Sequence, residues 1–356
     1  EKLISGEGII RNIIYGRLFH ERVLGDDPQV YTPWDVFGHC AQLSQMLRKS
    51  RFIGCLWSKH IHGFPPVFWH QSLDGSKLLY RRTHYGFGCA SLEELRQRTQ
   101  DAYREIASYG LTADVRVHAE DFQPPPAMIA GQGPWLKSLS PRIMVSGDGQ
   151  RRYFRSALTE ISAKGLRLPV TARDMEYYHQ GTPLTRLEFK MGNRLAENAI
   201  ISAEKFGTFA AHLGARYPER ALDKAWRQLL FNQHHDAITG PICDRAFLDV
   251  LAGYREALGL ASDALGNALR YIGRFIDTAS GAPTRESIPV AVFNPLNWRR
   301  SDVCEFQVEL PAGWKGCALQ SADGRQVAVE LTEPKRTGRR QFRIRFVAGE
   351  VPSLGY

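Results

Sequence analysis

Two histidines and an aspartate stand side by side in the second half of the chain, within the octapeptide Gln233-His234-His235-Asp236-Ala237-Ile238-Thr239-Gly240. Imidazole nitrogens and carboxylate oxygens are common ligands of zinc, and carboxylates also orient small polar ligands such as sugars. The same residues could instead end a helix, because histidine interacts favourably with a helix C-terminus and glycine stops the helix. The stretch alone therefore leaves two interpretations open, a metal or sugar site and a capped helix end.

A second candidate is Asp35, in the segment Pro33-Trp34-Asp35-Val36-Phe37-Gly38-His39. Aspartate is a favoured helix N-cap, and the residues that follow His39 have a helical pattern, so a capping role is one interpretation. The other is a reactive carboxylate placed between aromatic side chains. The segment by itself does not decide between them.

The elements that must position these residues fall into three regions. Residues 1–172 mix short apolar runs with helical stretches. Gly54–Trp57 and Val67–Trp69 read as buried strands, and Ser91–Ser108 as an exposed helix. A proline- and glycine-rich loop is expected over residues 124–134. This region predicts a partial α/β domain.

Residues 173–282 change to a helical period, and three amphipathic helices are expected there. The first starts near Thr185, the second runs from Glu219 to Phe231, and the third from Asp244 to Ile272. Short connections between antiparallel helices predict a three-helix bundle, with the His-His-Asp stretch at the end of the second helix. The apolar stripe predicted for the first helix consists of Leu187, Met191, Leu195, Ala199, Ser202, Phe206, Phe209 and Leu213.

Residues 283–356 follow a polar linker and have the alternation of β-strands. Val290–Phe293 and Val303–Leu310 are the expected strands. They predict the start of a β-sandwich, with too few strands before Tyr356 to complete one. The predicted fold class is therefore multidomain, with α/β, α and β regions in that order.

Composition excludes several functions. The net charge is +9, but the arginine pairs at 81–82, 151–152, 299–300 and 339–340 are scattered, so no nucleic-acid partner is expected. No apolar run approaches the ~18 residues of a membrane helix. The six cysteines form no CxxC pair, which mildly favours a reducing, cytoplasmic compartment. The chain starts at Glu1 without a signal-peptide pattern, so we expect it to start within a domain. An oligomeric state is not indicated.

Together, in this order and at this separation, the Asp35 and His-His-Asp motifs resemble glycoside hydrolase family 38, the zinc-dependent retaining α-mannosidases. Weaker resemblances occur in the same order along nearly the whole chain. They are Leu73-Asp74-Gly75-Ser76, Glu120-Asp121-Phe122, Tyr178-His179-Gln180-Gly181 and Phe293-Asn294-Pro295-Leu296. The resemblance implies a distorted α/β barrel as the catalytic domain and an α-mannoside or mannose-containing glycan as the substrate.

The resemblance also implies roles for individual residues. Asp35 would be the nucleophile and a zinc ligand, His235 a zinc ligand, and Asp121 the acid/base, with Glu120 as its neighbour or substitute. A retaining glycosidase needs one ionised and one protonated carboxyl group about 5–5.5 Å apart. Zinc would keep Asp35 ionised, whereas Glu120 and Phe122 would favour protonated Asp121. The implied substrate contacts are Phe37, Lys59, Tyr178 and Asp236.

One departure from the family concerns the zinc ligands. The family has a further His-x-Asp pair that supplies two zinc ligands, and here only one histidine, His20, precedes Asp35. We expect a fragment that lacks the pair, and the alternative is a non-catalytic carbohydrate-binding homologue without zinc. His60 and His62 are less favoured as substitute ligands. His39 is expected to hold the Asp35 loop by a hydrogen bond.

Overall fold

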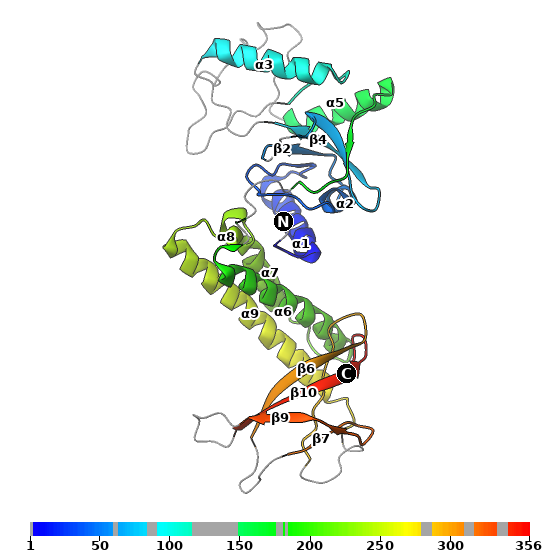
Figure 1. Cartoon of the computed structure of the whole chain (residues 1–356), viewed down its shortest axis with the longest axis vertical. Helices are drawn as coiled ribbons and strands as arrows, with labels where there is room; N and C mark the ends of the chain where they lie inside the picture. Colours follow the sequence, from blue (N-terminus) through cyan, green and yellow to red (C-terminus); the bar gives the residue numbers. More distant parts are fainter. Residues whose placement is uncertain are drawn as a thin grey trace. The chain divides into compact units, whose positions relative to one another are not determined.

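The computed structural model describes residues 3–59, 63–83, 91–115, 149–175, 181, 184–278, 287–309, 317–332 and 341–356 (Figure 1). The chain forms two compact units. Unit 1 consists of Glu1–Glu197 and Arg227–Tyr254, and unit 2 of Asn198–Trp226 and Arg255–Tyr356. The mixture of helices and sheets confirms a multidomain α/β protein, and the three predicted domain boundaries stay predictions.

Unit 1 is built on a five-stranded sheet in the order β1-β2-β4-β3-β5. Strand β2 pairs in parallel with β1 and β4, whereas β3 pairs antiparallel with β4 and parallel with β5. The predicted strands at Gly54 and Val67 are confirmed. The strand bounds are β1 Val30–Tyr31, β2 Gly54–Trp57, β3 Val67–Gln71, β4 Lys77–Arg82 and β5 Val170–Thr171.

Both faces of this sheet are covered, which explains why β2 is apolar along its whole length. Cys55 and Trp57 point to the face that packs on α1 (Gly6–Phe19) and α2 (Leu43–Lys49). Leu56 points to the other face, which packs on α3 (Leu92–Ala107) and α5 (Gly149–Lys164). Because successive side chains of a strand point to opposite faces, this one short strand contributes to two separate hydrophobic cores.

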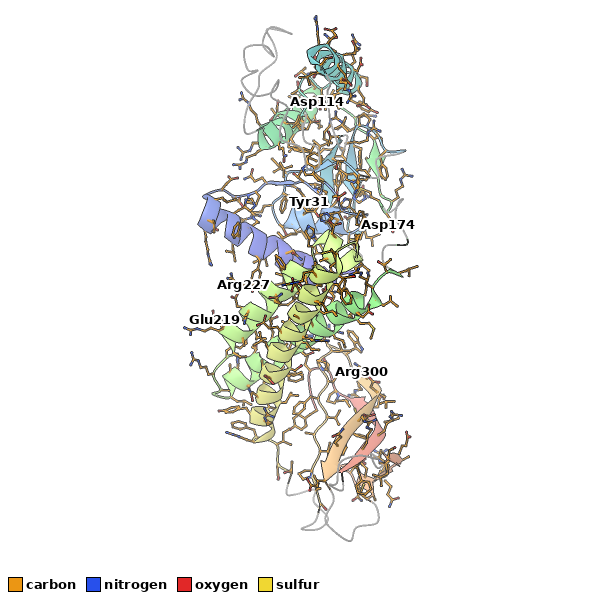
Figure 2. The ribbon with its side chains drawn as sticks, turned by 90° about the vertical axis from the view of Figure 1, so that its left-hand side faces the viewer. Tyr31, Asp114, Asp174, Glu219, Arg227 and Arg300 are labelled. Atoms are coloured by element: carbon orange, nitrogen blue, oxygen red, sulfur yellow. The ribbon has the colours of Figure 1, made fainter. Side chains whose placement is uncertain are left out.

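Two polar features stabilise unit 1 away from the candidate site. Ser91 caps α3 by accepting a hydrogen bond from the backbone N–H of Glu94 at 3.2 Å, as the predicted helix from Ser91 to Ser108 implies. The buried guanidinium of Arg81 on β4 donates to both oxygens of Asp114, at 2.7 and 2.9 Å (Figure 2). The bidentate geometry compensates the desolvation of the two charges.

The three predicted long helices are confirmed as α6 (Leu187–His212), α7 (Glu219–Asn232) and α9 (Asp244–Gly273). The predicted apolar stripe of α6 is wrong at both ends, because Phe209 and Leu213 are each 41% exposed and, in the first turns, Leu187, Met191 and Leu195 are 56%, 63% and 53% exposed. The buried positions there are Phe189, Asn193, Ala196 and Glu197. Polar residues that find hydrogen-bond partners occupy the inward face, so counting apolar residues alone placed the stripe on the wrong side.

The prediction that the His-His-Asp stretch ends the second helix is wrong. Helix α7 ends at Asn232, and a separate short helix, α8, runs from His235 to Thr239. Gly240 ends α8 with a left-handed φ of 104°. Thr239 is held there because its carbonyl accepts from Thr185 Oγ1 at 2.5 Å and from Lys190 Nζ at 3.0 Å.

Unit 2 contains a three-stranded antiparallel sheet in the order β6-β10-β9. Ile344, Phe346 and Ala348 on β10 pack against Phe306 and Val308 on β6. The predicted strand from Val303 corresponds to β6. The strand bounds are β6 Arg300–Glu309, β7 Leu319–Gln320, β8 Gln326–Val327, β9 Val329–Thr332 and β10 Gln341–Val351, and β7 pairs with β8.

The predicted strand Val290–Phe293 is wrong, because the described stretch 287–309 forms a strand only from Arg300. The segment is anchored by a side chain instead. Asn294 Nδ2 donates to the carbonyls of Trp298 and Pro352 at 2.7 and 3.0 Å. Within the described residues, none of the helices combines the length and hydrophobicity needed to cross a bilayer.

Candidate active site

The two motifs found in the sequence meet in unit 1. His235 Nε2, on the first residue of α8, lies 3.5 Å from Asp35 Oδ2, in the loop between β1 and α2. Neither capping interpretation holds, because α2 starts at Leu43 after an N-cap at Gln42, and the histidine pair begins a helix rather than ending one. The side chains of Asp35 and His235 are 25% and 26% exposed, so the pair is accessible from solvent.

A second carboxylate lies next to the same imidazole. Asp236 Oδ2 is 3.6 Å from His235 Nε2, and His234, His235 and Asp236 each offer a ligand atom within 4.8 Å of the others. Two atoms bound tetrahedrally at about 2.1 Å from zinc lie about 3.4 Å apart. The separations of His235 Nε2 from Asp35 Oδ2 and from Asp236 Oδ2 are each close to this value, and imidazole and carboxylate are donor types that zinc binds. Asp35 does not belong to the cluster formed by His234, His235 and Asp236, so His235 is the residue common to both pairs.

Lys59 and Phe37 complete the group. The ammonium of Lys59 forms an ion pair with Asp35 Oδ1 and lies 4.8 Å from the centroid of the Phe37 ring. That ring in turn meets the His235 ring edge-on, with centroids 6.1 Å apart. The structure thus brings together Asp35, Phe37, Lys59 and His235, which the sequence placed in three separate segments. Their chemical roles stay predictions.

The electrostatic surroundings favour neutral histidines. Burial lowers the pKa of His235, and nearby Lys59 lowers it further, whereas Asp236 raises it. Burial also lowers the pKa of His234, and its neighbour His235 adds to this effect. Neutral imidazole is the form that binds metal. At neutral pH the site therefore presents its histidines in the ligating state.

His234 and His235 have different structural roles. His234 is the N-cap of α8, where its Nδ1 accepts a hydrogen bond from the backbone N–H of Asp236 at 3.3 Å. Its ring lies against that of His235, with centroids 4.2 Å apart. His234 therefore supports the short helix, while His235 reaches Asp35.

The loop that carries Asp35 is held by two contacts. Sequence reasoning missed the one from Ser58, whereas His39 was expected to hold the loop by a hydrogen bond. Ser58 Oγ donates to the carbonyl of Trp34 at 2.7 Å, and the backbone of His39 forms a two-way bridge with Met175 at 3.1 and 3.0 Å. The His39 ring is fully buried next to Trp57. The signal for Ser58 was its position directly after the apolar strand at Gly54–Trp57, where a strand leaves the sheet.

Several predicted residues lie outside the described residues. These are the acid/base candidates Glu120 and Asp121, the substrate contact Tyr178, and the alternative ligands His60 and His62. The acid/base therefore stays a prediction.

A hollow of about 460 Å³ borders the site on the side of α1. Its walls are mostly apolar, with Ile9 and Ile13 from α1 and Leu43 from α2, and Phe37 and His235 belong to its lining. No sequence pattern predicted this hollow, because its walls come from segments far apart in the chain. It leaves room beside the imidazole for a ligand.

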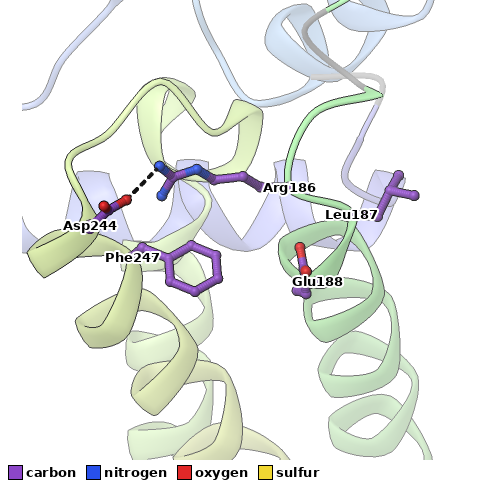
Figure 3. A pocket seen from close by; sticks show the side chains of 5 residues that line it. All are labelled: Arg186, Leu187, Glu188, Asp244 and Phe247. Atoms are coloured by element: carbon purple, nitrogen blue, oxygen red, sulfur yellow. Dashed lines mark hydrogen bonds and ion pairs between the residues drawn. The ribbon is translucent and has the colours of Figure 1, made fainter.

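A second hollow, of about 500 Å³, lies where α6 and α9 begin (Figure 3). The guanidinium of Arg186 lies 4.9 Å from the Phe247 ring centroid and donates to Asp244 Oδ1 at 3.1 Å. Arg186 also adjoins the end of α8, since a Cβ on Gly240 would lie 3.4 Å from Arg186 Cβ. The contacts around this hollow therefore fix the far end of the helix that carries His235.

Comparison with protein families identifies two matching segments. The model of the glycosyl hydrolases family 38 N-terminal domain matches residues 1–128, and that of the alpha mannosidase middle domain matches residues 177–272. Both the Asp35 motif and the His-His-Asp motif lie within these segments. The class is thus that of the glycoside hydrolases. Within it, the chain belongs to family 38.

Individual relatives agree. Alpha-mannosidase 2C1 from Mus musculus is 27% identical over 332 residues, which cover 89% of this chain and 30% of the relative. Alpha-mannosidase G from Dictyostelium discoideum is 23% identical over 299 residues, or 79% of this chain and 26% of the relative. The chain thus spans less than a third of the length of these curated relatives.

Solved structures show the same fold. An alpha-mannosidase from Enterococcus faecalis V583 superposes with a TM-score of 0.71 at 18% identity, over 99% of this chain and 45% of that one. A second glycosyl hydrolase family 38 protein from Enterococcus faecalis superposes with a TM-score of 0.66 at 17% identity, over 99% of this chain and 42% of that one.

Proposed function

We propose that the chain carries the active site of a zinc-dependent retaining α-mannosidase, which hydrolyses terminal α-mannosidic bonds in mannose-containing glycans. The observation that supports this most is the 3.5 Å separation of Asp35 Oδ2 and His235 Nε2. It joins the two motifs that resemble the family's nucleophile and zinc ligand. The alpha-mannosidase names of the relatives agree with the substrate.

The reaction would proceed in two displacement steps. In the first, a carboxylate oxygen of Asp35 forms a bond to the anomeric carbon while the glycosidic C–O bond breaks. The leaving oxygen takes the electron pair of that bond and a proton from Asp121. In the second, water attacks the anomeric carbon, its proton passes to Asp121, and the bond to Asp35 breaks. Two inversions give net retention.

The other residues would bind and orient the sugar. Lys59 holds one oxygen of Asp35 by its ion pair, which leaves the other oxygen facing His235. Phe37 provides an apolar wall, and Asp236 accepts hydrogen bonds from sugar hydroxyls. His235 and Asp35, with Asp236 beside them, would hold zinc. When bound, zinc would act as a Lewis acid that orients the hydroxyl groups of mannose.

The domain architecture that we propose with this function goes beyond the helices and strands given above. The sheet of unit 1 would belong to a distorted α/β barrel, and residues 173–282 would complete the active site as a three-helix bundle. Residues 283–356 would begin a β-sandwich. The buried faces of β2, α6 and β10 support this assignment.

The direct test is hydrolysis of an aryl α-mannoside by the protein as its gene encodes it. We expect activity that a chelator removes and zinc restores, loss of activity in Asp35→Asn, and NMR detection of the α-anomer as the first product. Activity that survives both the chelator and Asp35→Asn would refute the mechanism. The alternative function, carbohydrate binding without catalysis, predicts mannoside binding with neither hydrolysis nor bound zinc.

A further inference from the structure

Gln233, the residue directly before the histidine pair, uses every hydrogen-bonding group of its side-chain amide. Its Nε2 donates to Asn193 Oδ1 at 2.8 Å and to Glu197 Oε1 at 3.0 Å. Its Oε1 accepts from Asn12 Nδ2 at 2.8 Å. A primary amide has two N–H donors, and both are used here. The side chain is therefore fixed in one orientation by three partners from α1 and α6.

The partners are themselves firmly held. Asn193 and Glu197 are fully buried on α6. Glu197 Oε1 also accepts from the backbone N–H of Ser5 at 3.1 Å, and Glu197 Oε2 pairs with Arg194 at 3.3 Å. A Cβ on Gly8 would lie 2.6 Å from Glu197 Oε1, so a side chain at that position would displace the carboxylate. The network thus ties the start of α1, the inward face of α6 and Gln233 together.

This network acts on the turn that leads into α8. The backbone N–H of Gln233 donates to the carbonyl of Leu229 at 3.1 Å and that of His234 to the carbonyl of Phe231 at 3.2 Å, and the chain then turns into α8 at His235. A helix of five residues has too few internal bonds to be stable alone. Its direction is therefore set by what holds its two ends. Thr185 and Lys190 hold the far end, and Gln233 holds the near end.

We propose that Gln233 is a positioning residue for the metal site: through Asn12, Asn193 and Glu197 it fixes the turn between α7 and α8 and so directs His235 toward Asp35. The inference rests on the proposed function, because it treats His235 as a zinc ligand. The proposed role requires particular hydrogen-bonding groups at two positions. Position 233 must offer N–H donors to Glu197, whereas position 197 needs only an oxygen acceptor facing Gln233 and Ser5.

Substitutions at the two positions separate this role from a general structural one. Gln233→Met keeps the length of the side chain but removes all three hydrogen bonds. Glu197→Gln keeps an oxygen toward Gln233 and Ser5 and places its amino group at the position of Oε2, where it replaces the ion pair with Arg194, whereas Glu197→Met removes the acceptor. Gln97→Met is the matched control, because the Gln97 amide donates to the Asp101 carboxylate on the exposed face of α3, at 3.0 Å. Ile106→Val controls for a small loss of core stability far from α8.

The measurements are zinc affinity, by competition with a chromophoric chelator on metal-free protein, and the d–d absorption of the cobalt-substituted protein. We expect Gln233→Met and Glu197→Met to weaken zinc binding about 10- to 100-fold and to change the cobalt spectrum. Glu197→Gln and both controls should bind zinc within about threefold of wild type, since they leave the orientation of His235 unchanged. Equal affinity of Gln233→Met and wild type, or equal losses in Glu197→Gln and Glu197→Met, would overturn the proposal.

A metal-free readout separates this inference from the proposed function. In crystal structures of the metal-free wild type and Gln233→Met, we expect the distance from His235 Nε2 to Asp35 Oδ2 to increase in the variant. A wild type that binds no zinc would refute the metal site, and the two structures would still decide whether Gln233 directs His235. An unchanged distance in the variant would overturn the positioning role whatever the metal result.

Discussion

His235 Nε2 and Asp35 Oδ2 lie 3.5 Å apart, although strands β2 to β5 and helices α6 and α7 lie between the two residues in the sequence. Each stands on a short irregular segment, a loop for Asp35 and the first turn of α8 for His235. Neither segment has a stable conformation of its own, so the pair exists only when unit 1 is folded. We therefore expect variants of two kinds at this site: those that change its chemistry while unit 1 stays folded, and those that unfold unit 1 and so separate the pair.

Asp35→Asn should remove catalysis while leaving the fold intact. The amide has nearly the shape of the carboxylate but is a far weaker nucleophile and a poor metal ligand, so we expect kcat to fall by at least about 10³-fold. The measurement is hydrolysis of an aryl α-mannoside, with circular dichroism as the control for folding. Activity within tenfold of wild type would rule out Asp35 as the nucleophile.

The two adjacent histidines should respond differently to alanine. His235→Ala removes a proposed zinc ligand, so we expect zinc affinity to fall by more than about 100-fold with little change in melting temperature. His234→Ala removes the cap of α8, for which we expect a loss of about 1 kcal/mol in stability and a smaller loss of zinc affinity. Zinc content after dialysis and thermal unfolding test the contrast. If His234→Ala lost more zinc affinity than His235→Ala, the roles assigned to the two histidines would be exchanged.

His70 should make unit 1 less stable in mild acid. It is fully buried, with Nδ1 2.8 Å from Ser44 Oγ and Nε2 3.0 Å from the carbonyl of Arg173, and burial lowers its pKa below 6.5. Below pH 6.5 the unfolded chain therefore takes up a proton that the folded chain does not, so stability falls as the pH drops from 6.5 to the folded pKa. Above pH 6.5, His70 should add no pH dependence.

Melting temperatures measured between pH 7.5 and 5 check this expectation. His70→Gln keeps hydrogen-bonding groups at the same position but does not titrate, so its decline toward pH 5 should be shallower than that of wild type. Parallel curves for the two proteins would show that the loss in acid comes from other groups.

Gly54→Ala should destabilise the sheet by overpacking. A Cβ at this position on β2 would lie 2.1 Å from the fully buried Phe154 ring. We expect a loss of about 1–3 kcal/mol in the free energy of unfolding. Because the clash is with one ring, Phe154→Leu combined with Gly54→Ala should cost less than the sum of the two single variants. Additive losses in urea unfolding would contradict the direct clash.

The sequence predicted the elements of this protein better than their inward faces. Short apolar runs located β2 and β3, and the helical period located α6, α7 and α9. On α6, however, Asn193 and Glu197 are buried while Leu187 and Met191 are exposed. A hydropathy pattern places polar residues outside, and it carries no information about a hydrogen-bond network assembled from α1, α6 and Gln233.

The candidate site was predicted in its residues but not in its local structure. The types and order of Asp35, Phe37, Lys59 and His235 carried the family resemblance. The start of α8 was missed because His234 is an uncommon N-cap, and the usual cap residues are serine, threonine, aspartate and asparagine. The cavity next to His235 was missed because its walls come together only in the folded unit.

The shortness of α8 has a consequence for redesigning this protein. Its five residues supply the backbone N–H that donates to the His234 cap, the buried packing of Ala237 and Ile238, and the imidazole that faces Asp35. A substitution at Ala237 or Ile238 would therefore disturb the packing that also positions the imidazole. Engineered changes in metal preference or substrate selectivity are therefore better introduced in the walls of the adjoining cavity, on α1 and α2, where a side chain can be exchanged without rebuilding the short helix.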